Sequence, residues 1–372
     1  MTYSGNCRLG DLFTSRREKG RPGLPTLSVT LNDGLVNREE MDRKQETTLT
    51  PEEHLLVKPG DIAYNMMRMW QGAFGLADRE GLVSPAYVVL KAKKGIDPLY
   101  ASYLFKTARM KYLFWAYSYG LTDDRLRLYP SDITHIPAFV PELSRQRKVA
   151  EALSIWDRSI KVINELICAT TLQRKALANE LLSGTSRLQG FSDTWKRYHI
   201  REMGKVVAGG TPDTDIESYW GGTIPWATPT DIAAAKGRYI STTARQITNE
   251  GLKASAATKL PAGSLLVCTR ATICELAIST TEIATNQGFK SVIAHEGFST
   301  EFLYHLFATH KRQFVRLACG STFLELSKRD FERMTFAMPT RKEQDAIAIC
   351  INTFDDQVAI FNSAVSSSKC NK

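Results

Sequence analysis

Two short stretches of the chain combine cationic, aromatic and amide side chains in a way that suits contact with nucleic-acid bases. Arg68-Met-Trp70-Gln71 follows a predicted strand, and Thr269-Arg270 and Asn286-Gln287 hold similar places in the second half of the chain. Guanidinium and carboxamide groups can each form two hydrogen bonds to a base edge, and an indole ring can wedge between bases or stack on them. Tyr87 aligns with Phe289, two residues after the Asn286-Gln287 pair. These residues therefore predict base contacts.

Further cationic residues lie directly before two long helical patterns. They are Arg125 and Arg127 in the first half, and Lys328 and Arg329 in the second. Contacts from such residues to phosphates would fix the register of a protein on a duplex. For any single Arg or Lys the alternative is a solvated surface charge without a ligand.

No residue set in the sequence indicates catalysis. It lacks G-x-G-x-x-G, the phosphate-binding G-x-x-x-x-G-K-[ST], H-E-x-x-H, and any Pro-Pro dipeptide of the kind that amino-methyltransferases use against a flipped base. His305 and His310 are five residues apart, off the shared helix face that zinc would need. We predict no catalytic residue, no metal site and no cofactor in this chain.

Two long helices would have to position these residues. Pro141–Gln146 aligns with Pro339–Gln344, and with the same offset of 198 residues each segment continues with apolar residues at steps of four and three. This spacing is the seam of a coiled coil. The seam residues are Val149, Leu153, Trp156, Ile160, Ile163 and Ile167, matched by Ile347, Ile351, Phe354, Val358, Phe361 and Val365. Each helix needs a partner for its narrow apolar stripe, and the other helix is the obvious one.

Residues at the helix ends support this reading. Gly184 stands where a C-terminal cap belongs, and Thr340 with Glu343 three residues later forms a capping-box pattern. The alternative is two ordinary amphipathic helices that pack on unrelated cores.

The repeat extends beyond the helices. Pro59–Ile62 matches Ala262–Leu265, and Gly95–Phe105 matches Gly297–Phe307. Short apolar runs bounded by Pro and Gly predict strands in both blocks. Helical spacing appears over Pro98–Tyr119 and Thr300–Leu317. We therefore predict an α/β fold of two similar mixed domains, 1–140 and 185–338, separated by helices at 141–184 and 339–372.

Size and composition set broad limits. The 372 residues are 43% hydrophobic and 23% charged, which is ordinary for a soluble protein of two or more domains. No apolar run is long enough to cross a membrane and no signal peptide is visible. Seven scattered cysteines without a C-x-x-C pair favour reduced thiols and a cytoplasmic location. The net charge of +9 fits a polyanion partner, and it also fits a plain basic enzyme.

Several motifs resemble those of the specificity subunits of type I restriction-modification enzymes. They are Gly209-Gly-Thr-Pro212, Tyr219-Trp-Gly-Gly-Thr-Ile-Pro-Trp226 and Thr228-Pro-Thr-Asp231, together with the Leu-Ala-Asn-Glu-Leu-Leu-Ser-Gly184 ending of the first helix. Thr211 and Thr228 accordingly join the candidate DNA contacts. The first block lacks these motifs, and the second helix is shorter than the family pattern.

The resemblance implies a non-catalytic reader of double-stranded DNA in which each block recognises one half of a split, asymmetric site. The helices would pair antiparallel as a spacer and dock two modification subunits, which bind S-adenosylmethionine and methylate adenine. Restriction subunits would join this core, with ATP and Mg on the partner subunits. No membrane partner is implied.

Three alternatives stay open. A specificity chain of another restriction class would serve a partner that fuses methylation and cleavage. A coiled-coil interaction protein would show no salt-dependent affinity for duplex DNA. A self-contained enzyme would turn over without partners.

Overall fold

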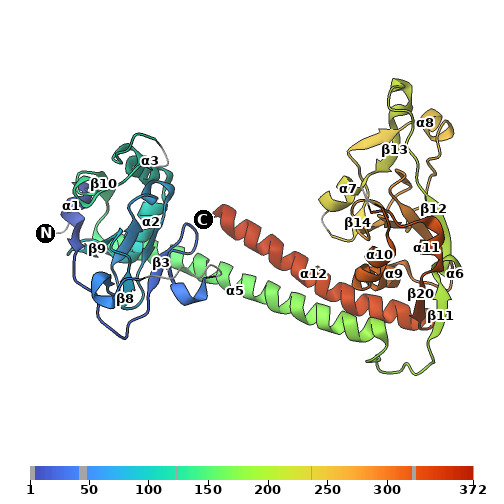
Figure 1. Ribbon diagram of the computed structural model, residues 1–372, viewed down its shortest axis with the longest axis horizontal. Coiled ribbons are helices and arrows are strands. Elements are labelled where there is room, and N and C mark those ends of the chain that lie inside the picture. Colours follow the sequence, from blue (N-terminus) through green and yellow to red (C-terminus); the bar gives the residue numbers. More distant parts are fainter. Residues whose placement is uncertain (1–4, 42–47, 123–124, 236, 321–323, 372) are drawn as a thin grey trace. The chain divides into compact units, whose positions relative to one another are not determined.

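The structure is a computed structural model that describes residues 5–41, 48–122, 125–235, 237–320 and 324–371, with the backbone alone at 369–371. It comprises two compact units, Met1–Ser159 and Ile160–Asn371 (Figure 1). The helices predicted from the repeat are present as α5 (Leu143–Ser183), which contributes to both units, and α12 (Arg341–Asn371).

The first unit is built on a four-stranded antiparallel sheet in the order β2-β9-β6-β7. These strands are β2 (Phe13–Arg16), β9 (Tyr87–Ala92), β6 (Ile62–Asn65) and β7 (Phe74–Leu76). Three further strand pairs are β1 (Gly5–Arg8) with β10 (Pro137–Val140), β3 (Leu27–Val29) with β4 (Leu35–Asn37), and β5 (Leu55–Val57) with β8 (Gly81–Val83). The short helices are α1 (Leu9–Leu12), α2 (Pro98–Lys106), α3 (Ala108–Ala116) and α4 (Pro130–Ile133). Phe105 of α2 is fully buried and packs against Phe13, Phe74 and Phe114, with ring centroids 5.2–5.7 Å apart.

The second unit contains a five-stranded sheet in the order β12-β19-β16-β17-β14. These strands are β12 (Gly204–Ala208), β19 (Lys290–Ala294), β16 (Leu265–Val267), β17 (Leu276–Ser279) and β14 (Tyr239–Ile240). A second sheet joins β15 (Arg245–Ile247), β13 (Trp220–Ala227) and β18 (Ala284–Thr285), and β11 (Lys196–His199) pairs with β20 (Thr335–Met338). The shorter helices are α6 (Ile200–Met203), α7 (Pro229–Ala234), α8 (Asn249–Lys253), α9 (Thr300–Thr309), α10 (Lys311–Leu317) and α11 (Lys328–Arg333).

The two units share one topology, which confirms the repeat inferred from the sequence. The order β2-β9-β6-β7 in the first unit corresponds to β12-β19-β16-β17 in the second, and in each unit an antiparallel strand pair joins the first strand to the last. The antiparallel pair β13-β15, with β13 parallel to β18, corresponds to β3-β4 with its parallel bridge between Thr26 and Leu82. Between these paired strands the second unit inserts α7 and β14.

The helical patterns at 98–119 and 300–317 each divide into two helices. In the first unit Thr107 lies between α2 and α3, and its hydroxyl accepts a hydrogen bond from the backbone N–H of Met110. Thr107 therefore acts as the N-cap of a new helix and interrupts the predicted one. In the second unit the break lies at His310.

A buried glutamine fixes the start of each long helix to its own domain. Gln146 Oε1 accepts from Asp97 N at 2.9 Å, and its Nε2 donates to the carbonyl oxygens of Gly95 and Pro141 at 3.0 and 2.8 Å. Gln146 is fully buried. Asp97 is the N-cap of α2, so one amide side chain connects the beginnings of two helices.

The second domain repeats this arrangement bond for bond. Gln344 Oε1 accepts from Ser299 N at 2.9 Å, and Nε2 donates to Gly297 O and Pro339 O at 3.3 and 2.9 Å. Gln344 is 1% exposed, and Ser299 is the N-cap of α9. The equivalence of the two domains therefore extends to individual hydrogen bonds.

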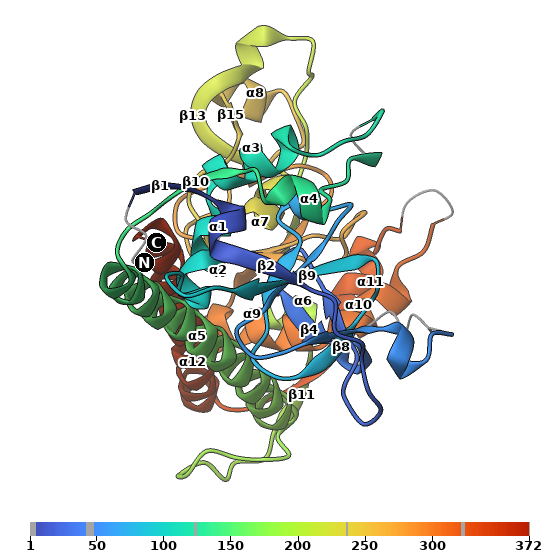
Figure 2. The same cartoon turned by 90° about the vertical axis from the view of Figure 1, so that its left-hand side faces the viewer.

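Within the second unit the end of α5 packs beside the start of α12, so the two helices run antiparallel (Figures 1 and 2). Leu181 and Leu182 share a core cluster with Ile347 and Ile351, and Arg174 Nε lies 2.9 Å from Asp355 Oδ1. The predicted cap is confirmed because α5 ends at Ser183 and Gly184 has a φ of 74°. In the described part of the chain no helix is both long and apolar enough to cross a membrane.

The predicted seam residues differ in burial. Ile347 and Ile351 are fully buried in the core of the second unit and Val365 is 8% exposed, whereas Val149 and Trp156 of the first unit are 38% exposed. The others are half-buried: Leu153, Ile160, Ile163, Ile167, Phe354, Val358 and Phe361. The carboxylate of Glu343, assigned to a capping box from the sequence, accepts from Arg187 Nε at 2.6 Å and Nη2 at 2.7 Å.

Replacing Gln344 by Ala should destabilise the second unit. The change leaves the buried groups that the amide binds, Gly297 O, Pro339 O and Ser299 N–H, without their partner. An unsatisfied buried polar group costs about 1–3 kcal/mol, so we expect a loss of at least that size in the free energy of unfolding, measured by urea denaturation. Gln357→Ala, at an exposed position of the same helix, is the control and should change stability by less than about 0.5 kcal/mol. Equal stability of the two variants would contradict this role of Gln344.

Candidate nucleic-acid interface

In the second unit the candidate residues gather around one turn, Asn286–Gly288, between β18 and β19. Asn286 Oδ1 accepts from Gly288 N at 2.9 Å and so holds the turn closed. Thr269, directly after the bridge between Cys268 and Phe289, donates through N and Oγ1 to Gly288 O at 2.7 and 3.2 Å. Arg270 follows, and a Cβ placed on Gly288 would lie 3.8 Å from its Cβ. Arg270, Asn286 and Gln287 are therefore close neighbours.

The Gly209–Thr211 segment lies against the same turn. A Cβ at Gly209 would lie 2.0 Å from Asn286 O, so only glycine fits there. Thr211 Oγ1 donates to Gln287 Oε1, and Gly210 N donates to Thr285 O at 2.9 Å. The Gly-Gly-Thr motif thus serves close packing and orients the Gln287 amide.

Two tryptophans of β13 support this segment, and Arg245 of β15 packs on both of their rings. The Arg245 guanidinium carbon lies 3.4 Å from the ring centroid of Trp220 and 5.7 Å from that of Trp226. Trp226 Nε1 donates to Gly210 O at 2.9 Å. The three-stranded sheet β15-β13-β18 thereby fixes the Gly209–Thr211 segment.

Two candidate threonines use their hydroxyl groups in hydrogen bonds within the domain. Thr269 is fully buried and its hydroxyl binds Gly288 O, so it positions the turn and does not face a base. The Thr228 hydroxyl donates to Asp231 Oδ2 at 2.5 Å at the start of α7, where it acts as a capping residue. Both were candidate DNA contacts on sequence alone.

Charged side chains surround the turn. Lys290 Nζ and Arg270 Nε lie 3.8 and 3.9 Å from the two oxygens of Glu325. Burial lowers the pKa of Lys290, and Lys328 and Arg270 act in the same direction, whereas Glu325 opposes them. Lys328 lies 3.6 Å from Glu332 on α11, and Arg329 is exposed. Lys290 and Glu325 were not found from the sequence, because only the tertiary fold brings them to Arg270.

The first unit brings its candidates together by the same strands. Tyr87 pairs with Asn65 across β9 and β6, and Arg68 follows β6 as the N-cap of the 3-10 turn η3 (Met69–Gln71). Arg127 precedes Leu128, whose N–H donates to Met66 O at 2.9 Å. Arg68, Gln71, Arg125 and Arg127 are exposed.

Trp70 makes contacts within the first unit. Its ring is half-buried and packs against the core of the first unit, and its Nε1 donates to Met67 O at 3.2 Å. In the structure this indole therefore supports the Arg68 turn from within.

Comparison with known proteins bears on what these domains are. Residues 192–365 match the family described as type I restriction modification DNA specificity domain. This part of the chain is therefore similar to that family. The match covers α12 up to Val365 as well as the block that carries the Asn286–Gly288 turn.

Curated relatives agree with this family. The chain is 37% identical over 166 residues to the type I restriction enzyme MjaIX specificity subunit of Methanocaldococcus jannaschii, an alignment that spans 44% of this chain and 38% of that protein. It is 26% identical over 216 residues to the EcoR124I/EcoR124II specificity subunit of Escherichia coli, spanning 55% and 51%. The chain thus matches about half or less of the length of these two relatives.

Solved structures share the fold over nearly the whole chain. The HsdS subunit from Thermoanaerobacter tengcongensis matches with a TM-score of 0.51 and 14% identity, covering 96% of this chain and 90% of that one. The type I restriction-modification S subunit from M. genitalium gives a TM-score of 0.62 with 13% identity, covering 98% and 92%. At such identity the likeness concerns the fold alone.

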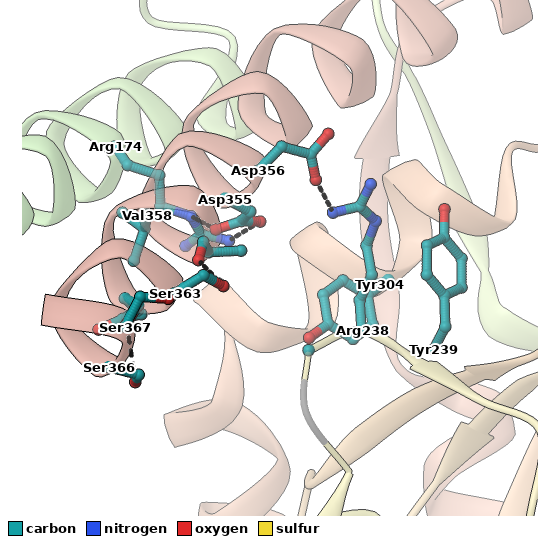
Figure 3. A pocket seen from close by; sticks show the side chains of 13 residues that line it. Arg174, Arg238, Tyr239, Tyr304, Asp355, Asp356, Val358, Ser363, Ser366 and Ser367 are labelled. Carbon is teal, nitrogen blue, oxygen red and sulfur yellow. Dashed lines mark hydrogen bonds and ion pairs between the residues drawn. The ribbon is translucent and has the colours of Figure 1, made fainter. Parts of the chain in front are cut away.

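Within the second unit the sheet domain meets the long helices through a polar network beside a cavity of about 1010 Å³ (Figure 3). Arg174 of α5 donates from Nη2 to His305 Nδ1 at 3.2 Å, so this ring nitrogen carries no proton. His305 Nε2 then donates to Asn352 Oδ1 at 2.7 Å, and Asn352 Nδ2 to Glu301 Oε2 at 3.3 Å. Arg238, just before β14, reaches Asp356 of α12 at 3.1 Å.

These contacts connect α9 and Arg238 of the second unit to α5 and α12, and the bonds made by Arg174, Arg238 and Glu301 are charge-assisted. Among the residues that the structure describes, no group of three or more His, Cys, Asp or Glu could hold a metal ion.

The stability of the second unit should depend on pH through His305. Burial lowers the pKa of His305 below its ordinary 6.5, and a proton on Nδ1 would face the Arg174 guanidinium; Asp355 and Glu301 act in the opposite sense. The unfolded chain takes up this proton below about pH 6.5 and the folded chain does not, so stability is present above that pH and falls as the pH drops. Urea denaturation between pH 7.5 and 5 should show a smaller loss in His305→Gln than in the wild type. An identical loss in both would contradict a neutral His305.

Proposed function

We propose that this chain is the DNA-recognition subunit of a type I restriction-modification complex and has no catalytic activity of its own. Each of its two domains would read one half of a bipartite, asymmetric site in double-stranded DNA. The family match of residues 192–365 supports the assignment for the second domain. The first domain is included because its strand order and its helix attachment are the same.

The observation that carries this proposal is that the domain occurs twice. Both copies are attached to their long helix by an equivalent buried glutamine, whereas their surfaces differ. Two equivalent domains suit a ligand with two equivalent parts, as double-stranded DNA offers to paired modules. In the described residues the second domain inserts α7 and β14 between β13 and β15, where the first has a short connection from β3 to β4, and the candidate side chains also differ. Two different readers on one framework would recognise two different half-sites.

The chemistry of the candidate residues agrees with DNA reading. Arg270 and Gln287 lie at one turn, and both side-chain types bind purine edges. Lys328 and Arg329 on α11 provide charges for phosphates, and the net charge is +9.

An apolar strip on α5 supports docking of a modification subunit. Ile155, Val162 and Leu166 are 50%, 52% and 44% exposed, and their spacing of seven and four residues places them on one helix face. Exposed apolar faces of this kind serve protein partners. We propose that the partners are two modification subunits that use S-adenosylmethionine, joined by restriction subunits that use ATP and Mg, and that the complex acts in the cytoplasm.

Exchanging residues 195–338 for the equivalent block of a relative tests this division. Lys196 pairs with Met338, so the exchanged segment enters and leaves the domain at one place and the chain path is preserved. With the chain assembled with a modification subunit, selection from randomised duplexes should change one half of the recognised motif and keep the other half and the spacing. A change in both halves, or in neither, would refute the assignment of one half to each domain. The assembled wild type, selected in parallel, is the control.

A further inference from the structure

One structural position holds a cation in the first domain, Arg127, and an anion in the second, Glu325. In the first, Arg127 and Tyr119 form an antiparallel bridge with backbone bonds of 2.9 and 3.0 Å; in the second, Glu325 and Cys319 form the same bridge, also at 2.9 and 3.0 Å. The residue that follows each is a buried leucine whose N–H donates to the segment after β6 or β16. Arg127 and Glu325 are therefore equivalent.

In the second domain this position lies beside Arg270, a candidate base contact. In the second domain Glu325 forms a further bridge with Arg270, and Ala271 N donates to Leu324 O at 3.1 Å. Ala271 has a φ of 60°, which is unusual for a residue with a side chain and fits a loop held in place by this contact. The backbone thus sets Glu325 directly beside Arg270.

The Glu325 carboxylate has capacity for a ligand. Its side chain is 45% exposed, and its distances of 3.9 Å to Arg270 Nε and 3.8 Å to Lys290 Nζ are longer than hydrogen bonds. The Lys290 side chain is 9% exposed, so Glu325 is the accessible member of that pair.

A carboxylate in this setting acts selectively on DNA. Arginine and lysine attract any phosphate, whereas a carboxylate repels phosphates and accepts hydrogen bonds only from donors. In the major groove those donors are the amino groups of cytosine and adenine, and guanine offers the acceptors that suit an arginine. DNA that brings no donor to Glu325 leaves its carboxylate with Arg270 and Lys290 alone as partners, at distances longer than hydrogen bonds.

We propose that Glu325 is a specificity-determining residue of the second domain, which accepts a hydrogen bond from the amino group of a cytosine or adenine. Arg127 is its counterpart in the first domain and reads a guanine. The inference rests on the proposed function and adds to it the position at which the two half-sites differ in chemistry.

The test uses the full-length chain assembled with a modification subunit and selection from randomised duplexes, with Glu325→Gln and Glu325→Ala compared with the wild type. Both variants should lose about tenfold or more of the preference at one base pair, in the half that belongs to the second domain. Arg127→Gln should do the same in the other half. Glu296→Gln is the matched control, because it removes the same charge beyond the far end of β19, about 20 Å along the strand, and should leave every position unchanged.

Three outcomes would overturn the inference. One is a motif in Glu325→Gln and Glu325→Ala that is unchanged at every position. Another is a uniform change in affinity for all sequences, since Glu325 would then act only on phosphates. The third is a wild type that selects no bipartite motif, and this alone would refute the proposed function as well. Glu325→Gln decides the matter, because it retains the side-chain shape and the backbone bridge with Cys319.

Discussion

A buried carboxamide at the start of each long helix is the constraint on which the rest of the structure depends. A glutamine side chain both accepts and donates, so Gln146 and Gln344 can each bind a backbone N–H and two carbonyl groups at once. The N–H groups belong to the N-cap residues of α2 and α9. The carbonyl groups lie two residues before these N-caps and just before each long helix. Because both amides are buried, water cannot take the place of a lost hydrogen bond, and the loss lowers the stability of the fold. Each domain is therefore fixed to the first turn of its helix.

The second domain has additional attachments that the sequence does not reveal. Arg174, His305, Asn352 and Glu301 form a chain of hydrogen bonds between α5, α9 and α12. In the first domain the equivalent of His305 is Tyr103, whose hydroxyl donates to Asp157 of α5 at 2.7 Å. Both domains thus bind a long helix from the same place with different chemistry. Such contacts hold the orientation of a recognition surface, and orientation decides which base edges its side chains can reach.

Much of the architecture could be predicted because it depends on local pattern. The seam spacing, Gly184 and the internal matches around Pro141 and Pro339 are visible in one sequence, and they led to the helices and to the duplicated α/β domain. The adjacency of Arg270 to the Asn286-Gln287 pair was not predicted, because it depends on the bridge between Cys268 and Phe289. Residues whose roles depend on tertiary contacts were not predictable. Lys290 and Glu325 are far apart in sequence, Thr269 is buried by its neighbours, and Glu343 binds Arg187 from outside its helix.

The surface difference between the domains has a structural origin. Among the described residues, α7 and β14 lie between β13 and β15 of the second domain, whereas a short connection joins the equivalent strands β3 and β4 of the first. Arg245 packs on Trp220 and Trp226 in this part of the second domain. The shared framework and the variable surface are therefore separate parts of one fold. This separation is what two different half-sites require.

The most direct measurement of the central claim is position-resolved sequencing of methylated adenines in DNA from cells that carry this chain together with a modification subunit. The account predicts a motif of two specified parts of different sequence at a constant separation, with a methylated adenine in each part, and its loss when this chain is removed. A single continuous motif, or methylation that persists without this chain, would contradict it.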